Sequence, residues 1–563
     1  MPISLIPPEV LARIFHLLVL EEPPCSRQQD LDWIRATHVC HFWRQVALGD
    51  SSLWATISCI PTNTELISEM LAHARDAPLD IDIGAQRREV ILMFLPHLHH
   101  TRKLRLYNLS MLHSDILQTI YDLEAPVLEH LELGVSASFP TFFQDLGGTT
   151  LFKGQAPRLQ TLFLIQVLVP WSLIPRGQLT QLKIVLSNGV SPTVIPPAVE
   201  SGDFNQLIDL LANCPGLETL VLEHCLPSQL AQFSHGQTIH LPRLSRLCLG
   251  GSSSCIMNLM KMLRVPSSTT LHLRCISENT LAHSDRLLLP VVLAKLQSPA
   301  PVEFQNLSIT VTLNVYYSLK VTASTIVPSS RSPQPQDFGG DVDGDAEFVL
   351  SFDEVRLGNY SDLLERVCKM LPISNLEFLS ISSFYIGDSV NWVELFKRCT
   401  KITAIQAIGG GTSSFVRALT IPEATNTKPN EKGKQKRRDD RDSTLAQPGR
   451  STSSAADGPI FPKLTFLSLK RQDFSEGQHP SGNLFDVVER GLRQRVVAYN
   501  TPLEMLHIYN CFISAQHAEA LQKLVQKFHW DQDEGFDGFD NFDDYVRYNP
   551  DTDELEVLMG AFF

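Results

Sequence analysis

The chain has 563 residues, more than one ordinary core accommodates, so several domains or a repeat array are expected. Hydrophobic residues make up 43% and charged residues 19%, a composition typical of a globular protein and not of a disordered one. The formal net charge of −14 argues against a broad nucleic-acid-binding face, because neutralising phosphates requires clustered lysine and arginine.

The cysteines and the N-terminus indicate the compartment. Cysteine occurs 11 times, scattered along the chain and without a Cys-x-x-Cys pair, so the thiols are expected to be core residues. The N-terminus has neither the basic start nor the apolar run of a secretory signal. No stretch approaches the roughly eighteen apolar residues of a membrane span. We therefore expect a reduced intracellular protein, cytoplasmic or nuclear, with neither membrane nor nucleic acid as a partner.

The first predicted element is an amphipathic helix beginning at PPEVLARIFHLL, residues 7–18. Prolines suit the first turn of a helix, and Glu9 suits the positive end of its dipole. A second helical pattern starts near residue 31, carries Trp43, and ends at Gly-Asp-Ser before Trp54. The apolar side chains that share one face of the first helix are Val10, Leu11, Ile14, Phe15 and Leu18.

About fifty residues in two or three helices are too few to form a self-sufficient hydrophobic core. The apolar side chains left exposed are therefore expected to pack against a partner or against the rest of the chain. Their sequence closely resembles the F-box, whose pattern is Leu-Pro-x-Glu-Ile-Leu, Ile-Phe, Val-Cys-x-x-Trp-Arg and Leu-Trp. Residues 6–11, 14–15, 39–44 and 53–54 fill those places in order. Ile6 stands where leucine is usual, and the loop at 21–30 is long, as in many fungal F-box proteins.

The resemblance implies a docking role. F-box domains bind a Skp-family adaptor, which links them to a cullin–RING ubiquitin ligase. Docking of this kind places apolar anchors in a groove, so it predicts that Phe15 and its neighbours face solvent, whereas Trp54 packs inward. The alternative is a plain terminal cap that buries the same side chains against the array. Carried over residue by residue, the adaptor-facing side chains are Ile6, Pro7, Glu9, Val10, Leu11, Ile14, Phe15 and Trp43.

Downstream, the motif Pro-x-Leu-x-x-Leu-x-Leu recurs along the chain. It resembles a leucine-rich repeat, whose short strand points its leucines inward, although a set of ordinary buried strands is the alternative. Copies lie at residues 126–133, 157–164, 215–222, 242–249 and 462–469, with shorter or looser ones at 178–184, 375–381, 401–407 and 502–508. Helical patterns alternate with them at 65–75, 88–99, 115–123, 204–213, 256–263, 361–371, 392–398, 484–497 and 515–528.

The expected fold class is α/β. A helical F-box-like module at 1–60 precedes an irregular leucine-rich-repeat-like solenoid of alternating helices and short parallel strands at 61–563. Three segments interrupt this array. Residues 307–324 and 348–357 alternate apolar and polar, which predicts two antiparallel strands joined by a mobile loop at 325–347. A disordered insertion is predicted at 424–459 and a flexible acidic tail at 531–563.

Motifs typical of catalysis or metal binding are mostly missing from the sequence. DVDGD at 341–345 lacks the later Gly and Glu of a calcium loop, and His97, His99 and His100 have no acidic or cysteine neighbour. KGKQKRR at 432–438 fits a nuclear import signal or a solvated charge run equally. We found no hydrolase or metalloprotease motif, so no enzyme activity, metal or cofactor is expected.

The sequence therefore predicts a substrate-recognition subunit of an SCF-type ubiquitin ligase. In this hypothesis the N-terminal module holds the Skp adaptor, and the array holds a target protein that the sequence does not identify. A ligase-independent leucine-rich scaffold is the alternative.

Overall fold

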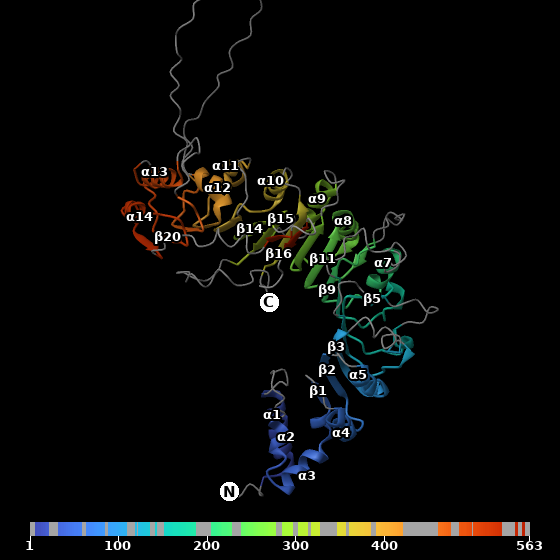
Figure 1. The fold of residues 1–563 in the computed structure, drawn as a ribbon. Coiled ribbons are helices and arrows are strands. Elements are labelled where there is room, and N and C mark those ends of the chain that lie inside the picture. The colour runs from blue at the N-terminus through green and yellow to red at the C-terminus, as the bar shows by residue number, and fades with distance from the viewer. Residues whose placement is uncertain are drawn as a thin grey trace, which may run out of the picture. The chain divides into compact units, whose positions relative to one another are not determined.

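The computed structural model forms two compact units. The first unit is Met1–Ala300 with Glu347–Phe352, and the second unit is Pro301–Ala346 with Asp353–Phe563 (Figure 1). The residues that the structure describes are 6–21, 32–58, 64–84, 88–109, 119–120, 122–135, 141–142, 151–186, 204–227, 238–276, 284–296, 302–313, 317–326, 346–355, 360–383, 390–419, 460–474, 483–497, 499–531, 546–549 and 554–557.

The first unit begins with a helical module. It consists of α1 (Pro8–Glu21), α2 (Asp32–Ala36), α3 (His41–Gly49) and the 3-10 turn η2 (Ser51–Trp54). The backbone amides of Val10 and Leu11 both donate to the Pro7 carbonyl at 3.1 Å, which starts α1 where the prolines predicted it. α1 packs against both α2 and α3, so the short helices share one small core.

A parallel sheet makes up the rest of the first unit. Each strand pairs in parallel with the next in the order β1, β2, β3, β4, β6, β8, β9, β11 and β13. Their bounds are β1 (Thr56–Ser58), β2 (Leu79–Gly84), β3 (Thr101–Leu109), β4 (His130–Val135), β6 (Thr161–Ile165), β8 (Gln181–Val185), β9 (Thr219–Glu223), β11 (Arg246–Ser252) and β13 (Thr270–Ile276).

Helices and short side strands connect these parallel strands. The helices are α4 (Thr64–Ala74), α5 (Arg88–Phe94), η3 (Leu95–His100), η5 (Leu151–Gly154), η6 (Trp171–Leu173), α7 (Phe204–Ala212), α8 (Ser253–Met262) and α9 (Ser284–Leu296). Two further parallel pairs are β5 (Thr141–Phe142) with β7 (Val167–Leu168), and β10 (Ile239–His240) with β12 (Leu263–Arg264).

The second unit has the same alternation. β14 (Asn306–Leu313) pairs in parallel with β17 (Phe378–Ser383), and β18 (Ala404–Ile408), β19 (Phe466–Lys470), β20 (Met505–Tyr509) and β21 (Lys527–Trp530) follow, also in parallel. Its helices are α10 (Tyr360–Met370), α11 (Trp392–Phe396), η8 (Gly410–Thr412), α12 (Ser413–Ala418), α13 (Leu484–Val497) and α14 (Ala515–Gln522). β16 (Phe348–Val355) belongs to both units by residue and pairs with β13.

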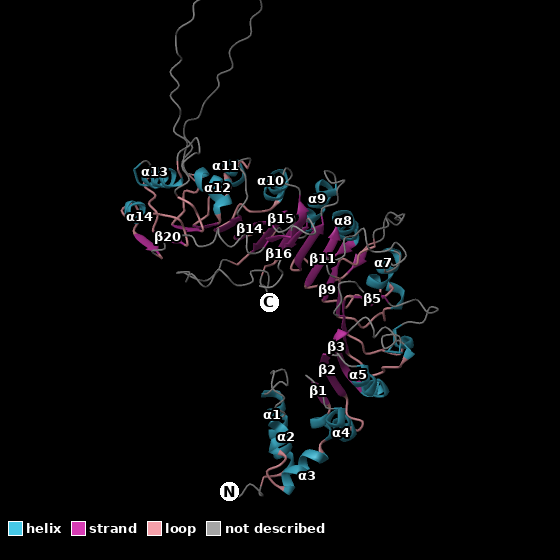
Figure 2. Ribbon diagram, viewed as in Figure 1, coloured by secondary structure: helices cyan, strands magenta, loops and turns pink. Residues whose placement is uncertain are grey.

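The recurring leucine motif supplies the buried core of both units. Every copy overlaps one of these parallel strands, as predicted, and leucines such as Leu162 and Leu164 in β6 or Leu467 and Leu469 in β19 are buried. Because successive side chains of a strand point to opposite faces, the intervening residues lie on the other face of the sheet. Within each unit the helices run along one side of the strands (Figure 2). The arrangement is consistent with solenoid-like repeats.

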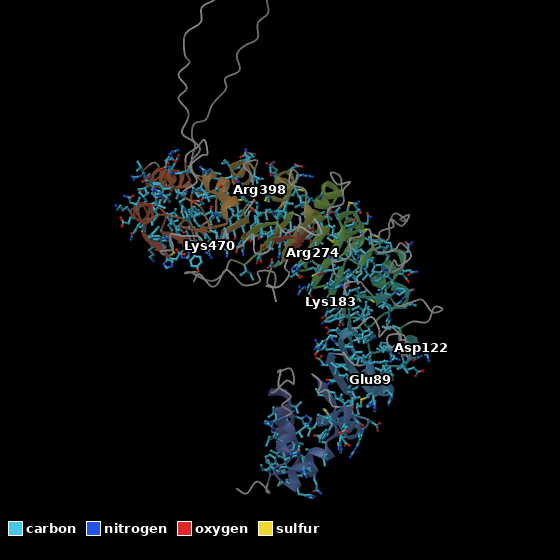
Figure 3. All side chains as sticks on the ribbon, in the orientation of Figure 1. Glu89, Asp122, Lys183, Arg274, Arg398 and Lys470 are labelled. Carbon is cyan, nitrogen blue, oxygen red and sulfur yellow. The ribbon has the colours of Figure 1, made fainter. Side chains whose placement is uncertain are left out.

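Two arginine side chains of the second unit donate to backbone carbonyls of the segment that precedes them in the fold. Arg495 of α13 donates from Nη2 to the carbonyls of Phe461 at 2.9 Å and Leu464 at 3.3 Å. Arg398, labelled among the helices in Figure 3, donates in the same way to the Leu371 carbonyl at 3.0 Å, just after α10. The Phe461 and Leu371 carbonyls also accept from the backbone amides of Leu464 and Ile373, so each arginine adds a second donor.

Two segments have a secondary structure that differs from the prediction. Residues 307–324 are not one strand but an antiparallel hairpin of β14 and β15 (Tyr317–Ser324), in which Ile309 lies opposite Val321. The expected helix at 515–528 ends at Gln522, and β21 follows it. The hairpin gives β14 a second strand partner beside β17, which one continuous strand could not provide.

The interrupting segments are described only in small part. Nearly all of the predicted loop 325–347 and the whole insertion 424–459, with its KGKQKRR run, lie outside the described residues. The DVDGD segment lies outside them too. In the tail, β22 (Val546–Asn549) and β23 (Glu554–Val557) form an antiparallel pair. In the part of the chain that is described, no helix has the length and apolar character needed to cross a membrane.

Candidate functional site

The inner face of α1 forms the core of the helical module. Leu11 and Phe15, four positions apart, are completely buried, and the Phe15 ring meets the Trp43 ring of α3 edge to face at 5.6 Å between centroids. The expectation that Phe15 faces solvent is therefore wrong. Its position on α1 points it at α3, so the ring stabilises the module from inside.

The outer face of α1 is apolar and open to solvent. Val10 is 49% exposed and Leu17 is 45% exposed, Pro7 is exposed, and Ile14 is partly exposed. Spacings of three and four residues place these side chains in one line along the helix, which we call the outer stripe (Pro7, Val10, Ile14, Leu17). A contiguous exposed apolar stripe is typical of a surface that a partner covers.

The remaining predicted residues divide between the two faces. Glu9 is exposed and Ile6 is partly exposed near the start of the outer stripe. Trp43 is half-buried, and its indole Nε1–H has no hydrogen-bond acceptor among the described residues. Leu17 was not predicted, although its position three residues after Ile14 is a signal that could have found it.

A polar cluster joins α1 to the end of α3. His16 Nε2 lies 3.0 Å from Asp50 Oδ2, and Ser52 donates to Asp50 Oδ1 from both its backbone N at 3.1 Å and its Oγ at 2.6 Å. Burial alone raises the pKa of Asp50, but the Ser52 hydrogen bond and His16 outweigh it, so the pKa lies below its ordinary value. The ionised carboxylate thus holds the inner face of α1 against α3.

Trp54 connects the module to the rest of the first unit, as the sequence predicted. It is buried, and its Nε1 donates to the Ala47 carbonyl at 2.9 Å. On the other side its ring lies 4.8 Å from the His73 ring of α4. Trp43 therefore supports Phe15 inside the module, while Trp54 anchors the module to α4.

The helix-free face of the first unit carries an ion-paired ladder on β2, β3 and β4. Arg102 Nη2 lies 2.6 Å from Asp80, and Arg105 bridges Asp82 at 2.7 Å and Glu132 at 2.8 Å. His130 and the Arg105 guanidinium lower the pKa of Glu132 to about 2, and the shorter Arg105 contact is the stronger because His130 Nε2 is 3.7 Å away. Two guanidinium groups thus pair with three carboxylates across these strands.

A different pairing occurs further along the same face. Lys183, labelled in Figure 3, places its ammonium 5.7 Å from the centre of the Phe163 ring on the neighbouring strand.

The histidine cluster at 97–100 stabilises a turn. His97 Nδ1 lies 3.0 Å from His100 Nε2, while His100 Nδ1 reaches the Ala77 carbonyl at 2.9 Å. Burial, followed by the neighbouring His100 and His99, lowers the pKa of His97, so the neutral ring is favoured. Among the described residues no three His, Cys, Asp or Glu side chains are arranged to hold a metal ion.

Comparison with known proteins bears on the module alone. Residues 3–60 match the family model described as F-box-like. That range covers α1, α2, α3, η2 and β1, hence the outer stripe, the Phe15–Trp43 contact and the Trp54 anchor. No curated protein matches the chain.

Proposed function

Because the N-terminal module of this chain is an F-box-like domain, we propose that the protein is a substrate-recognition subunit of an SCF-type ubiquitin ligase. F-box domains generally bind Skp-type adaptors. In this proposal the outer stripe docks in a groove of the Skp adaptor, and the parallel-strand units bind the target protein. The adaptor connects the complex to a cullin.

The proposal rests on one observation: some apolar side chains of α1 are buried in the module's core, and others are exposed to solvent. Leu11 and Phe15 already occupy the module's own core, so they have no apolar surface left for a partner. Val10, Ile14 and Leu17 instead leave apolar area in water. Covering an aliphatic side chain of this size gains about 1.5–3 kcal/mol at full burial, so a groove that takes the stripe has a sufficient driving force.

The chain would act by positioning. A ligase subunit of this kind holds the target beside a ubiquitin carrier, which raises the effective concentration of the target's lysines. The bond-forming chemistry then belongs to other subunits of the ligase. This role needs two independent binding surfaces on one chain and no catalytic group.

The test is capture of the host's purified Skp adaptor by the full-length chain. The double variant Val10→Asp, Leu17→Asp places charge on the outer stripe without touching the module's core, so it should abolish stoichiometric capture while circular dichroism and the melting temperature stay unchanged. Val393→Asp on α11 is the matched control, because Val393 is 46% exposed on a helix outside the module. It should bind the adaptor normally.

Failure has a definite meaning in this design. If the wild-type chain does not capture the adaptor, the ligase role is refuted and the scaffold alternative is favoured. If the wild type binds and the double variant binds equally well, the outer stripe is not the docking surface.

A further inference from the structure

The parallel sheet of the second unit ends at a strand that pairs on one side. β21 is the last of these parallel strands and lies beside β20, at the end of the unit where α14 lies (Figure 1). Among the described residues no other strand pairs with β21. The Lys527 amide donates to the Glu504 carbonyl at 2.8 Å. Because backbone groups alternate in direction along a strand, those of Phe528 and Trp530 point to the open edge.

The side chains of β21 on the core side of the sheet are partly exposed. Phe528 and Trp530 are half-buried, whereas their lateral neighbours on β20, Leu506 and Ile508, are completely buried. The inward side chains of β17, β18 and β19 are buried as well. Each repeat of an array buries its apolar face against the next, so the last repeat needs a cover of its own. The two aromatic side chains of β21 therefore offer apolar surface that a further strand would cover.

The other side of the same strand carries opposite charges at its two ends. Lys527 and His529 are exposed there, and the Lys527 ammonium has no ion-pair partner among the described residues. Asp531 follows the strand directly, and its carboxylate accepts from the Asn510 amide just after β20. Lys527 and Asp531 lie at equal spacing on either side of His529. An edge with this order of charges is complementary to a reversed copy of itself.

We propose that two copies of this chain associate by antiparallel pairing of their β21 strands about a twofold axis at His529. In this register Phe528 lies opposite Trp530 of the partner subunit, and Lys527 lies opposite Asp531 of the partner subunit. Each pair occurs twice, because a twofold interface repeats every contact. The dimer covers the apolar end of both arrays and joins the two sheets into one.

Three requirements select this register. Opposite residues of an antiparallel pair share one face of the sheet, so a shift by one residue would set the exposed Lys527 against an inward Trp530. A shift by two residues would keep the faces but would separate Lys527 from Asp531. In the register centred on His529, Phe528 and Trp530 both direct their backbone groups across the edge, so they form hydrogen-bonded pairs in which each N–H donates to the opposite carbonyl.

The experiment is sedimentation equilibrium of the full-length chain over a range of protein concentrations. The wild type should form a dimer. Lys527→Asp and Asp531→Lys each turn both attractive charge pairs into repulsive ones, so either variant alone should dimerise about thirtyfold more weakly. An equimolar mixture of the two variants restores both attractive pairs and should dimerise as the wild type does. Lys463→Asp, at an exposed lysine before β19 in the same unit, is the matched control and should dimerise normally.

Hydrogen exchange locates the contact. The amides of Phe528 and Trp530 should exchange more slowly as the concentration of the wild type rises, but not as that of Lys527→Asp rises.

Several outcomes would overturn the inference. They are a wild type that stays monomeric, charge variants that dimerise as strongly as the wild type, and a mixture that does not recover. Dimers formed only by a chain ending at Asp531 would also overturn it, because the chain's own tail would then occupy the edge. The inference does not rest on the proposed function, which Skp adaptor capture by Lys527→Asp tests separately; capture should equal that of the wild type.

Discussion

Replacing Phe15 by alanine decides whether this residue belongs to the module's core or to a docking surface. The phenyl ring is completely buried and meets Trp43 edge to face. Removing a buried phenylalanine side chain costs about 3–5 kcal/mol, of which the aromatic contact accounts for about 0.5–1.5 kcal/mol. A helical module this small holds about 3–5 kcal/mol in its own core, so the substitution should unfold α1 locally.

Hydrogen exchange with mass spectrometry measures this in the full-length chain. Peptides from α1 should lose their protection in Phe15→Ala, while peptides from β4 serve as the internal reference and exchange as in the wild type. Phe15→Leu keeps most of the apolar volume and should cost only about 1–1.5 kcal/mol. It should therefore retain both a protected α1 and capture of the Skp adaptor.

Either of two results would refute the reasoning. Unchanged protection of α1 in Phe15→Ala would mean that the ring contributes nothing to the core. Loss of adaptor capture in a fully protected Phe15→Leu variant would make Phe15 a contact residue, and the outer stripe would then not account for docking.

The other predictions concern buried charge and pH. Arg495→Met removes the hydrogen bonds to the Phe461 and Leu464 carbonyls and should lower the unfolding free energy of the second unit by about 2 kcal/mol in urea melts, with Arg495→Lys intermediate. His507 has a folded pKa of about 4 against 6.5 ordinarily, so the unfolded state takes the proton first. Stability should fall by up to about 3 kcal/mol between pH 6.5 and 4, and an unchanged slope in His507→Gln would contradict this. Glu132 acts in a lower window, because its pKa of about 2 gives stability that is present above pH 4.5 and lost as the pH falls to 2. Glu132→Gln should cost the first unit about 2 kcal/mol at neutral pH and flatten its unfolding free energy over that window.

The strands could be predicted from the sequence because the Leu-x-Leu spacing defines both the element and the face. Leucine at alternate positions suits a strand with one buried side, and every copy of the motif overlaps such a strand. The hairpin at 307–324 escaped prediction for a related reason. Its alternation of apolar and polar residues continues to the connection, where NVYY supplies no glycine or proline to indicate a turn.

The two faces of α1 show what periodicity leaves undetermined. Helical spacing put Val10 and Phe15 on one broad apolar face, but the half that α3 covers depends on packing between helices. The sequence therefore placed Phe15 outside and overlooked Leu17. The pairing of residues on distant strands was beyond reach for a similar reason. Gln406 and Ser468 are 62 residues apart, and only the parallel register of β18 and β19 makes them neighbours.

In the proposed complex the outer stripe would gain free energy by leaving water, and this driving force is non-directional. It therefore suits one constant partner with a preformed groove, and adaptor binding should show a negative heat-capacity change.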